Sequence, residues 1–143
     1  MTQRQADEFL FRIDQLTVDH KPSFGKMNVH QMVCHCTDFF RMAKGTKKAK
    51  EYGVVNQDTI KSLAKAGKPT PTPKGFGQVE GDGTKPTDFE KDRGILKDSL
   101  LEFSKLPIDF DFAPHPYFGE MKYSAWTSLA AYHMNHHLEQ FNV

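Results

Sequence analysis

The sequence predicts an all-α fold, a four-helix bundle with a long crossover between the second and third helices. Four segments place apolar residues at spacings of three and four, which is the pattern of an amphipathic helix. No segment alternates apolar and polar residues as a half-buried strand does. A chain of 143 residues is long enough for one domain with a substantial core and short for two. We therefore expect residues 1–143 to form a single four-helix-bundle domain.

The first two helices have clear boundary signals. Residues 3–16 carry one apolar stripe, made of Ala6, Phe9, Leu10, Ile13 and Leu16. Pro22 prevents this helix from continuing. The second helix is expected to start at Asn28, an N-cap residue with Gln31 three positions later as its capping-box partner. It should end at Gly45, because glycine readily adopts the left-handed conformation of a helix C-terminus.

The connection between the second and third helices, residues 45–87, is the least regular part of the chain. Residues 56–66 are expected to form a short helix within it. Residues 67–86 are rich in proline and glycine, which indicates irregular structure. A loop of this length is either a lid over a functional site or a plain surface crossover, and both interpretations stay open. Its length also allows the helices on its two sides to run parallel.

The third and fourth helices follow this connection. The third is expected to start at Thr87 or Asp88 and to end before Pro107. Residues 107–122 form a second irregular link. Ser124 is expected to cap the fourth helix. One face of that helix carries Trp126, Leu129, Ala130, His133, His137, Gln140 and Phe141.

The charge balance excludes several classes of partner. The 19 Lys and Arg residues nearly offset the 18 Asp and Glu residues, which leaves a formal charge of +1. This balance provides no basic surface for nucleic acid or anionic lipid, so we expect neither as a partner. No apolar run approaches the roughly 20 residues that span a membrane, and the first residues lack the apolar segment of a signal peptide. We expect a soluble, cytoplasmic protein.

Three histidines can share one metal ion. Residues four apart lie on the same face of a helix, so His133 and His137 can direct two imidazoles to one point. His35 lies in the middle of the apolar stripe of the second helix. We predict that His35, His133 and His137 bind zinc, nickel or iron(II) and leave coordination positions open. The alternative is a polar cluster of core histidines without a metal.

The remaining histidines are weaker candidates. His30 lies on the side of the second helix opposite the apolar stripe, and we expect it to face solvent. His136 and Tyr132 either border the site or face solvent, which is the outcome that their helical angles favour. His20 and His115 lie in proline-bearing links and receive no assignment.

The two cysteines are not a metal or redox pair. Side chains two apart on a helix diverge by about 200°, so Cys34 and Cys36 cannot bind one ion together. Their spacing also differs from that of a zinc knuckle or a thioredoxin motif. We expect two reduced thiols that pack as small apolar residues.

Three polar residues near the predicted site are candidates for catalysis: Asp38, Gln31 and Gln140. Each lies within one helical turn of a predicted ligand, so each can orient a ligand or transfer a proton. Asp38 could act as a general base, and the alternative is an ordinary surface carboxylate.

The motifs in combination resemble a known family. Residues 25–27 (Gly-Lys-Met), 31–35 (Gln-Met-Val-Cys-His), Trp126 and 133–141 are similar to the DinB/YfiT-like superfamily of four-helix bundles. Within it, they resemble the uncharacterised branch DUF1569, as does the His-Pro-Tyr-Phe-Gly segment at 115–119. The resemblance covers nearly the whole chain.

This resemblance implies a divalent metal held by His35, His133 and His137. It also implies a possible homodimer and, as a small-molecule substrate, a low-molecular-weight thiol that the metal activates for transfer or isomerisation. The chain departs from the pattern at two places. Phe24 stands where tryptophan is expected, and residues 137–140 lack the Arg-Gly step of many relatives.

These observations support three functional hypotheses. The first is a metal-dependent enzyme, a thiol S-transferase or a hydrolase, with open coordination positions at the three histidines. The second is a non-catalytic bundle in which a closed metal site joins the second and fourth helices. The third is a small-molecule binding or sensing module whose pocket is covered by residues 67–86.

Overall fold

The protein is all-α, as expected. The computed structural model describes all 143 residues and contains no β-strand. A single isolated β-bridge joins His115 and Gly119. It has five helices rather than four, because the short segment expected at 56–66 forms one of its own. The helices are α1 (Gln3–Asp14), α2 (Val29–Lys44), α3 (Gln57–Lys65), α4 (Phe89–Ser104) and α5 (Tyr123–Gln140). None of them is both long enough and apolar enough to cross a membrane.

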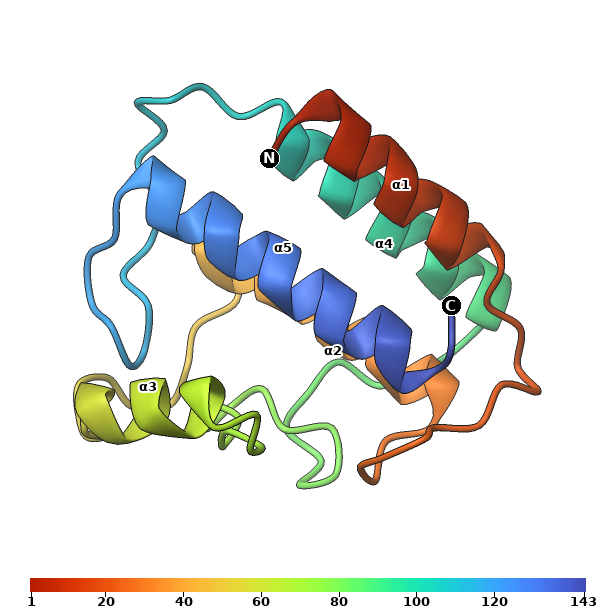
Figure 1. Cartoon of the computed structure of the whole chain (residues 1–143), viewed down its shortest axis with the longest axis horizontal. Helices are drawn as coiled ribbons and strands as arrows, with labels where there is room; N and C mark the ends of the chain where they lie inside the picture. Colours follow the sequence, from red (N-terminus) through yellow and green to blue (C-terminus); the bar gives the residue numbers. More distant parts are fainter.

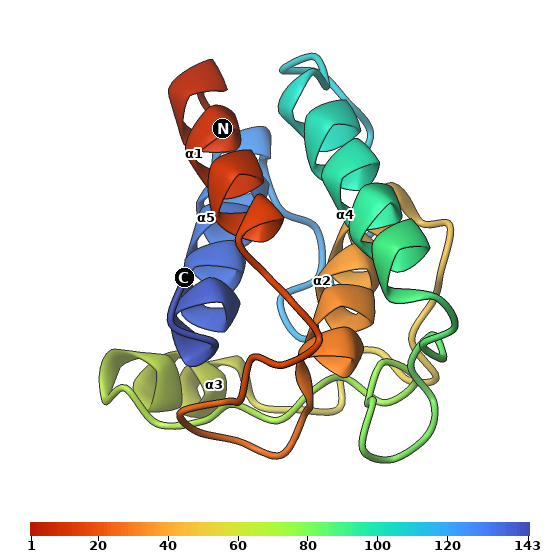
Figure 2. The same ribbon diagram turned by 90° about the vertical axis from the view of Figure 1, so that its right-hand side faces the viewer.

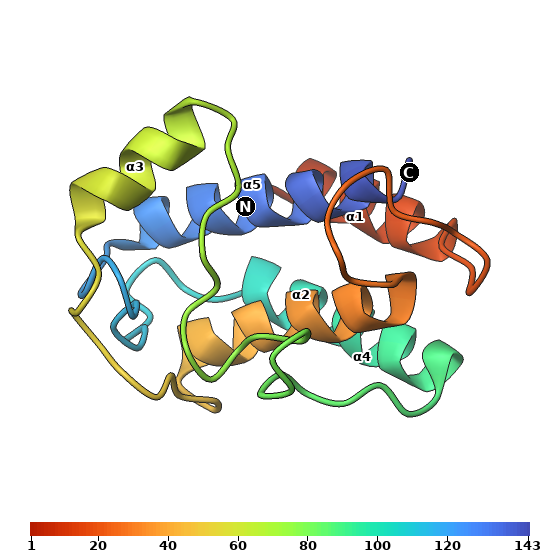
Figure 3. The same ribbon diagram turned by 90° about the horizontal axis from the view of Figure 1, so that it is seen from below.

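Four of the helices pack against one another, and α3 lies outside this group. α2 and α1 each contact both α4 and α5. Figure 2 shows α1 and α5 on one side of the molecule and α2 and α4 on the other. Figures 1 and 3 place α3 beside the N-terminal half of α5.

α2 and α4 run in the same direction. His30 near the start of α2 contacts Asp92 near the start of α4, and Lys44 at the end of α2 contacts Glu102 near the end of α4. The long connection between them therefore returns the chain to the same end of the molecule before α4 begins, as its length suggested.

The helix boundaries follow local signals, with one exception. Asn28 and Gln31 form the expected capping box, and Gly45 ends α2 with φ of 78°. The predicted capping by Ser124 is wrong. α5 begins two residues earlier than a Ser124 cap requires, at Tyr123, and its N-cap Lys122 makes no side-chain hydrogen bond. The amides of Ala125 and Trp126 bond the carbonyl of Lys122, which places Ser124 inside the first turn.

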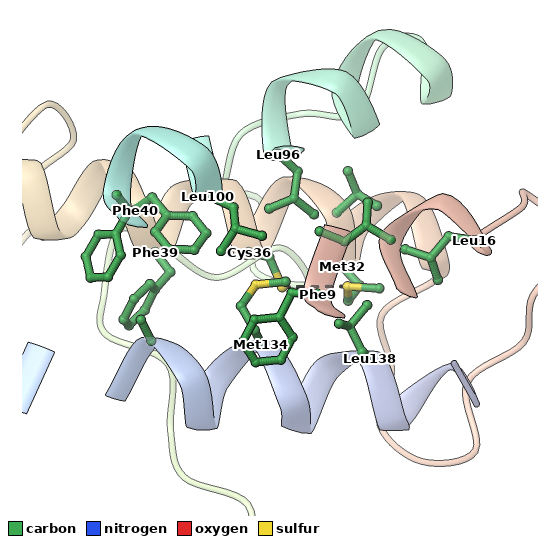
Figure 4. Packing of buried hydrophobic residues seen from close by; sticks show 14 of the residues in the cluster. Phe9, Leu16, Met32, Cys36, Phe39, Phe40, Leu96, Leu100, Met134 and Leu138 are labelled. Atoms are coloured by element: carbon green, nitrogen blue, oxygen red, sulfur yellow. Dashed lines mark hydrogen bonds between the residues drawn. The ribbon is translucent and has the colours of Figure 1, made fainter. Parts of the chain in front are cut away.

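The core lies between the four packed helices. Its labelled members in Figure 4 come from every one of these helices or the turns that follow them: Phe9, Leu16, Met32, Cys36, Phe39, Phe40, Leu96, Leu100, Met134 and Leu138. Each large apolar side chain buried here contributes roughly 1.5–3 kcal/mol through removal from water. Cys34 and Cys36 are both buried free thiols, as expected. Cys36 packs in the apolar core, whereas the thiol of Cys34 contacts the carboxylate of Asp92 at 3.8 Å.

The crossover between α3 and α4 is fastened to α2 by Asp38. One carboxylate oxygen accepts hydrogen bonds from the amide of Thr84 at 2.8 Å and from Lys47 at 3.1 Å. The other accepts from the Thr84 hydroxyl at 2.6 Å and from Arg41 at 3.1 Å. Asp38 is 0% exposed, so it is not a surface carboxylate. The packing of Phe76 into the core attaches the crossover at a second point.

Candidate metal centre

His35, His133 and His137 converge between α2 and α5. Nε2 of His35 lies 3.0 Å from Nε2 of His133, and the ring of His137 is centred 4.6 Å from that of His35 and 4.5 Å from that of His133. One nitrogen of each ring lies within 4.8 Å of the corresponding nitrogens of the other two. α2 and α5 are antiparallel here, because the later residue Phe39 of α2 contacts Trp126 and His133, whereas the earlier residue His35 contacts His133 and His137.

The spacing of these nitrogens suits a common metal ion. Two imidazole nitrogens that each lie about 2.0–2.1 Å from one ion at angles of 90–109° are separated by roughly 2.8–3.4 Å. The two Nε2 atoms of His35 and His133 lie within that range, at 3.0 Å. Three neutral imidazoles are also a donor set that zinc, nickel and iron(II) accept. The residues therefore fit a divalent ion.

Gln140 fixes the tautomer of His137. Its Nε2 donates to the backbone carbonyl of Phe24 at 2.8 Å, and a carbonyl can only accept. The amide is therefore oriented so that its Oε1 accepts from Nδ1–H of His137, also at 2.8 Å. This leaves the lone pair of His137 on Nε2. Gly25 permits the arrangement, because a Cβ at this position, with φ of +79°, would lie 2.7 Å from Nε2 of Gln140.

Burial keeps the three histidines neutral. It lowers the pKa of His35 to about 4 and that of His137 to about 3. Burial also holds the pKa of His133 well below its usual value, and the neighbouring His137 and His35 lower it further. A neutral imidazole offers a nitrogen lone pair, which a protonated one does not. At pH 7 all three side chains are thus in the form that binds metals.

The triad faces a cavity of about 830 Å³. Its walls come from α2, α3, α5 and three connecting segments, and all three histidines line it. Residues 68–73 and Phe76 line it as well, so the first half of the 67–86 segment forms part of its wall. Pro71 of this segment is tied to the opposite connection, because its carbonyl accepts from the hydroxyl of Tyr117 at 2.7 Å. A volume of this size suits a small molecule.

The other two catalytic candidates, Gln31 and Asp38, already form hydrogen bonds that hold the fold together. Oε1 of Gln31 accepts from the amide of Asn28 in the capping box, at 2.9 Å. Burial tends to raise the pKa of Asp38, but its hydrogen bonds from Thr84 and Lys47 outweigh this effect and hold the pKa below its usual value. Asp38 is therefore ionised at pH 7, with both oxygens already bonded.

His30 does not face solvent, contrary to the expectation. Its side chain is only 21% exposed and its Nε2 lies 2.7 Å from Oδ2 of Asp92. The first turn of α4 covers this side of α2, and a helical wheel drawn for α2 alone contains no information about α4. Cys34 approaches the same carboxylate, and burial together with Asp92 raises the pKa of its thiol to about 12.

Residues at the cavity edge are partly exposed. Tyr132 is 54% exposed and its ring stacks on that of His136, and both line the cavity. His136 is half-buried, with its ring 5.0 Å from that of His137. The two side chains therefore lie at the border of the site and also reach solvent.

The sequence did not reveal two further residues of the cavity. His115 is buried and lines the cavity through the link between α4 and α5, and Lys61 lines it from α3. The sequence signal in this link was the His-Pro-Tyr-Phe-Gly segment at 115–119, which resembles DUF1569. The structure folds it into a turn with Gly119 at φ of +66°.

Comparison with known proteins gives one match. Residues 78–143 match a family model described as "Protein of unknown function (DUF1569)". No curated protein and no solved structure matches the chain. The matched region contains α4 and α5, and with α5 the ligand candidates His133 and His137. Over residues 78–143, its C-terminal part, the chain is thus similar to the DUF1569 family.

Proposed function

We propose that the protein binds one divalent metal ion through His35, His133 and His137 and uses it to act on a small molecule held in the cavity. The observation that carries this proposal is the convergence of three neutral imidazoles at the surface of a cavity of about 830 Å³. When bound, the ion would act as a Lewis acid and lower the pKa of a coordinated water or thiol. Zinc, nickel and iron(II) all suit the donor set.

The number of protein donors favours an open site over a closed structural one. Structural zinc sites have four protein ligands, whereas catalytic sites have three and keep a position for water or substrate. The cluster at this site comprises His35, His133 and His137, with no cysteine, carboxylate or fourth histidine in it. The positions left free would face the cavity that the three residues line.

The surrounding side chains orient the ligands and exclude water. Gln140 fixes the ring of His137, and Phe39 stacks on the ring of His133 with centroids 4.6 Å apart. The apolar side chains Met42 and Phe76 line the cavity as well. Such a wall strengthens electrostatic interactions at the metal. We propose thiol transfer or hydrolysis as the reaction class, with a low-molecular-weight thiol among the substrates.

Kinship with the DinB/YfiT-like superfamily is part of the proposal. Four packed helices, in which α1 and α2 each contact α4 and α5, support it. So do the long connection after α2 and the ligand candidates on α2 and α5. In this reading α3 is an addition within the connection, and its residues help to line the cavity.

A non-catalytic binding module is the second candidate, and the lack of a free carboxylate near the triad favours it. Glu120 is the only acidic residue that lines the cavity, and Asp38 is occupied by Thr84 and Lys47. Turnover of thiol or ester substrates separates the two candidates, because a binding module would bind the same compounds unchanged.

Elemental analysis tests the metal directly. We expect protein purified without a metal-affinity tag to contain about one zinc, nickel or iron per chain. X-ray absorption of that metal should show imidazole nitrogens plus at least one light ligand from outside the protein. Metal-free protein that also fails to bind added zinc, nickel or iron(II) would contradict the proposal, and four protein ligands would favour a structural site.

Replacing Gln140 tests the orientation of His137. Gln140→Leu is expected to weaken metal binding by about 10- to 100-fold, because Nδ1–H of His137 loses its acceptor. Gln140→Glu keeps an acceptor and should restore most of the affinity. The measurement is a competition titration with a chelator of known affinity. Equal affinities of the leucine variant and the natural protein would show that Gln140 does not position the ligand.

A further inference from the structure

His115 carries a proton at a fixed position. Its Nδ1 accepts hydrogen bonds from the backbone amides of Tyr117 at 3.0 Å and Phe118 at 3.3 Å. A ring nitrogen that accepts carries no proton, so the neutral imidazole is protonated on Nε2. Burial lowers the pKa of His115 to about 4, which keeps the ring neutral at pH 7. At that pH, therefore, Nε2–H can only donate.

This donor is directed to the cavity. Nε2 of His115 has no hydrogen-bond partner within the protein. Only two side-chain nitrogens are both fully buried and without a partner, Nε1 of Trp126 and Nδ1 of His133, so Nε2 of His115 is not fully buried. Nε2 of His115 therefore keeps some accessible surface. Because the residue is only 6% exposed and lines the cavity, that surface opens into the cavity.

The same cavity is lined by a lysine, Lys61, which like His115 contacts the ring of Phe118. The ring of Phe118 stacks on that of His115 with centroids 4.8 Å apart. The ammonium of Lys61 lies 6.0 Å from the centroid of the Phe118 ring. Lys61 has no acidic partner, whereas the lysines that form ion pairs lie away from the cavity: Lys44, Lys47, Lys50, Lys74 and Lys97.

The cavity as a whole is electropositive. The charged side chains that line it are the lysines 61, 68 and 122 and a single glutamate, Glu120. The chain carries a formal charge of only +1, so positive charge is concentrated here relative to the rest of the molecule. A ligand that carries an anionic group is favoured in such a cavity.

We propose that His115 and Lys61 bind an oxygen anion of the substrate, a carboxylate, phosphate or sulfonate. One oxygen accepts from Nε2–H of His115 and the charge faces the ammonium of Lys61. The substrate class is then a small organic anion whose anionic group lies at His115 and whose reactive group lies at the triad. The reactive end rests on the proposed function, whereas the binding of the anion requires no metal.

Two dyes that differ by one sulfonate provide the test. 8-Anilinonaphthalene-1-sulfonate and N-phenyl-1-naphthylamine share the same aromatic body, and only the first is an anion. Fluorescence titrations at low salt should show the sulfonate dye binding at least about tenfold more tightly. The preference should shrink as salt is added, because screening weakens the attraction to Lys61.

Matched variants locate the anion. His115→Asn keeps an acceptor near the amides of residues 117 and 118 but removes the Nε2–H donor, and Lys61→Gln removes the charge from an exposed side chain. Each should weaken binding of the sulfonate dye about five- to tenfold and leave the neutral dye unchanged. Lys65→Gln, one turn later on α3 and outside the cavity lining, is the control and should bind both dyes like the natural protein.

Each other outcome contradicts the inference. Equal affinity for the two dyes, or a sulfonate affinity that neither His115→Asn nor Lys61→Gln reduces, would overturn it. So would an equal loss in Lys65→Gln. The His133→Ala variant separates this inference from the proposed function, because it removes a metal ligand and should retain the preference for the sulfonate. Absence of metal would overturn the proposed function alone.

Discussion

Replacing any one histidine of the triad by alanine is expected to reduce the bound metal from about one ion per chain to below about 0.1. His35→Ala, His133→Ala and His137→Ala each remove one of only three protein ligands, so affinity should fall by at least about 100-fold, more than the loss of an orienting partner costs. The measurement is metal content by elemental analysis, followed by a chelator competition for the residual affinity.

Thermal unfolding gives a second measure of the same variants. A ligand that binds only the folded state stabilises it by about 2.7 kcal/mol when its concentration is 100 times its Kd. Added zinc should therefore raise the Tm of the natural protein and leave that of the three variants unchanged. His136→Ala is the matched control, because this residue lines the cavity next to His137 but is not in the triad. Metal loss in His136→Ala equal to that in the others would contradict the assignment.

Asp38→Asn is expected to lower the free energy of unfolding by about 3 kcal/mol. The substitution keeps the shape of the side chain but replaces one carboxylate oxygen by an NH2 group, which is a donor. This NH2 group then faces other donors, on Thr84 and on either Lys47 or Arg41. Removing one partner of a buried ion pair typically costs about 3–5 kcal/mol of stability. Because Arg41 and Lys47 are both partly exposed, we expect a cost at the lower end of that range. Urea unfolding followed by circular dichroism at pH 7 measures the change.

The effect of Asp38 should also depend on pH. The pKa of this carboxyl is lower in the folded protein than its value of about 3.9 in an unfolded chain. Its contribution is therefore complete above about pH 5 and is lost as the pH falls through the folded-state pKa. The difference in stability between the natural protein and Asp38→Asn should be largest near pH 7 and should shrink in acid.

A control with the same chemical change separates this effect from a general loss of charge. Asp98→Asn removes an exposed carboxylate on α4 that forms no ion pair, and it should change stability by less than about 0.5 kcal/mol. Equal unfolding midpoints for Asp38→Asn and the natural protein at pH 7 would show that the crossover does not depend on Asp38.

The helices could be predicted because their signals are local. The capping box of Asn28 and Gln31, the left-handed Gly45 and the apolar stripes each act within a few residues, and the structure has them where expected. The same periodicity placed His35 and His133 on inward faces, and these faces meet. The start of α5 was missed because the backbone entered the helix at Tyr123 without a capping side chain.

The candidate site was only partly accessible from the sequence. A helical wheel indicates which side of a helix is apolar, and from that the three histidines could be selected. It does not indicate which helix lies against a polar side, so the contact of His30 with Asp92 was missed. The helical wheel also left two interpretations of Asp38 open, a surface residue or a general base. In the structure Asp38 is buried and accepts hydrogen bonds from Thr84 and Lys47, which lie outside α2.

The sequence by itself determined the all-α class, the helix boundaries other than the start of α5, and the histidines that share a face, because these depend on spacing within single helices. Only the tertiary structure decided that residues 68–73, α3 and the 115–119 turn enclose a cavity above the triad. It also decided that His115 is buried in the wall of that cavity. Both depend on contacts between segments far apart in the chain, and irregular segments have no periodicity from which such contacts could be predicted.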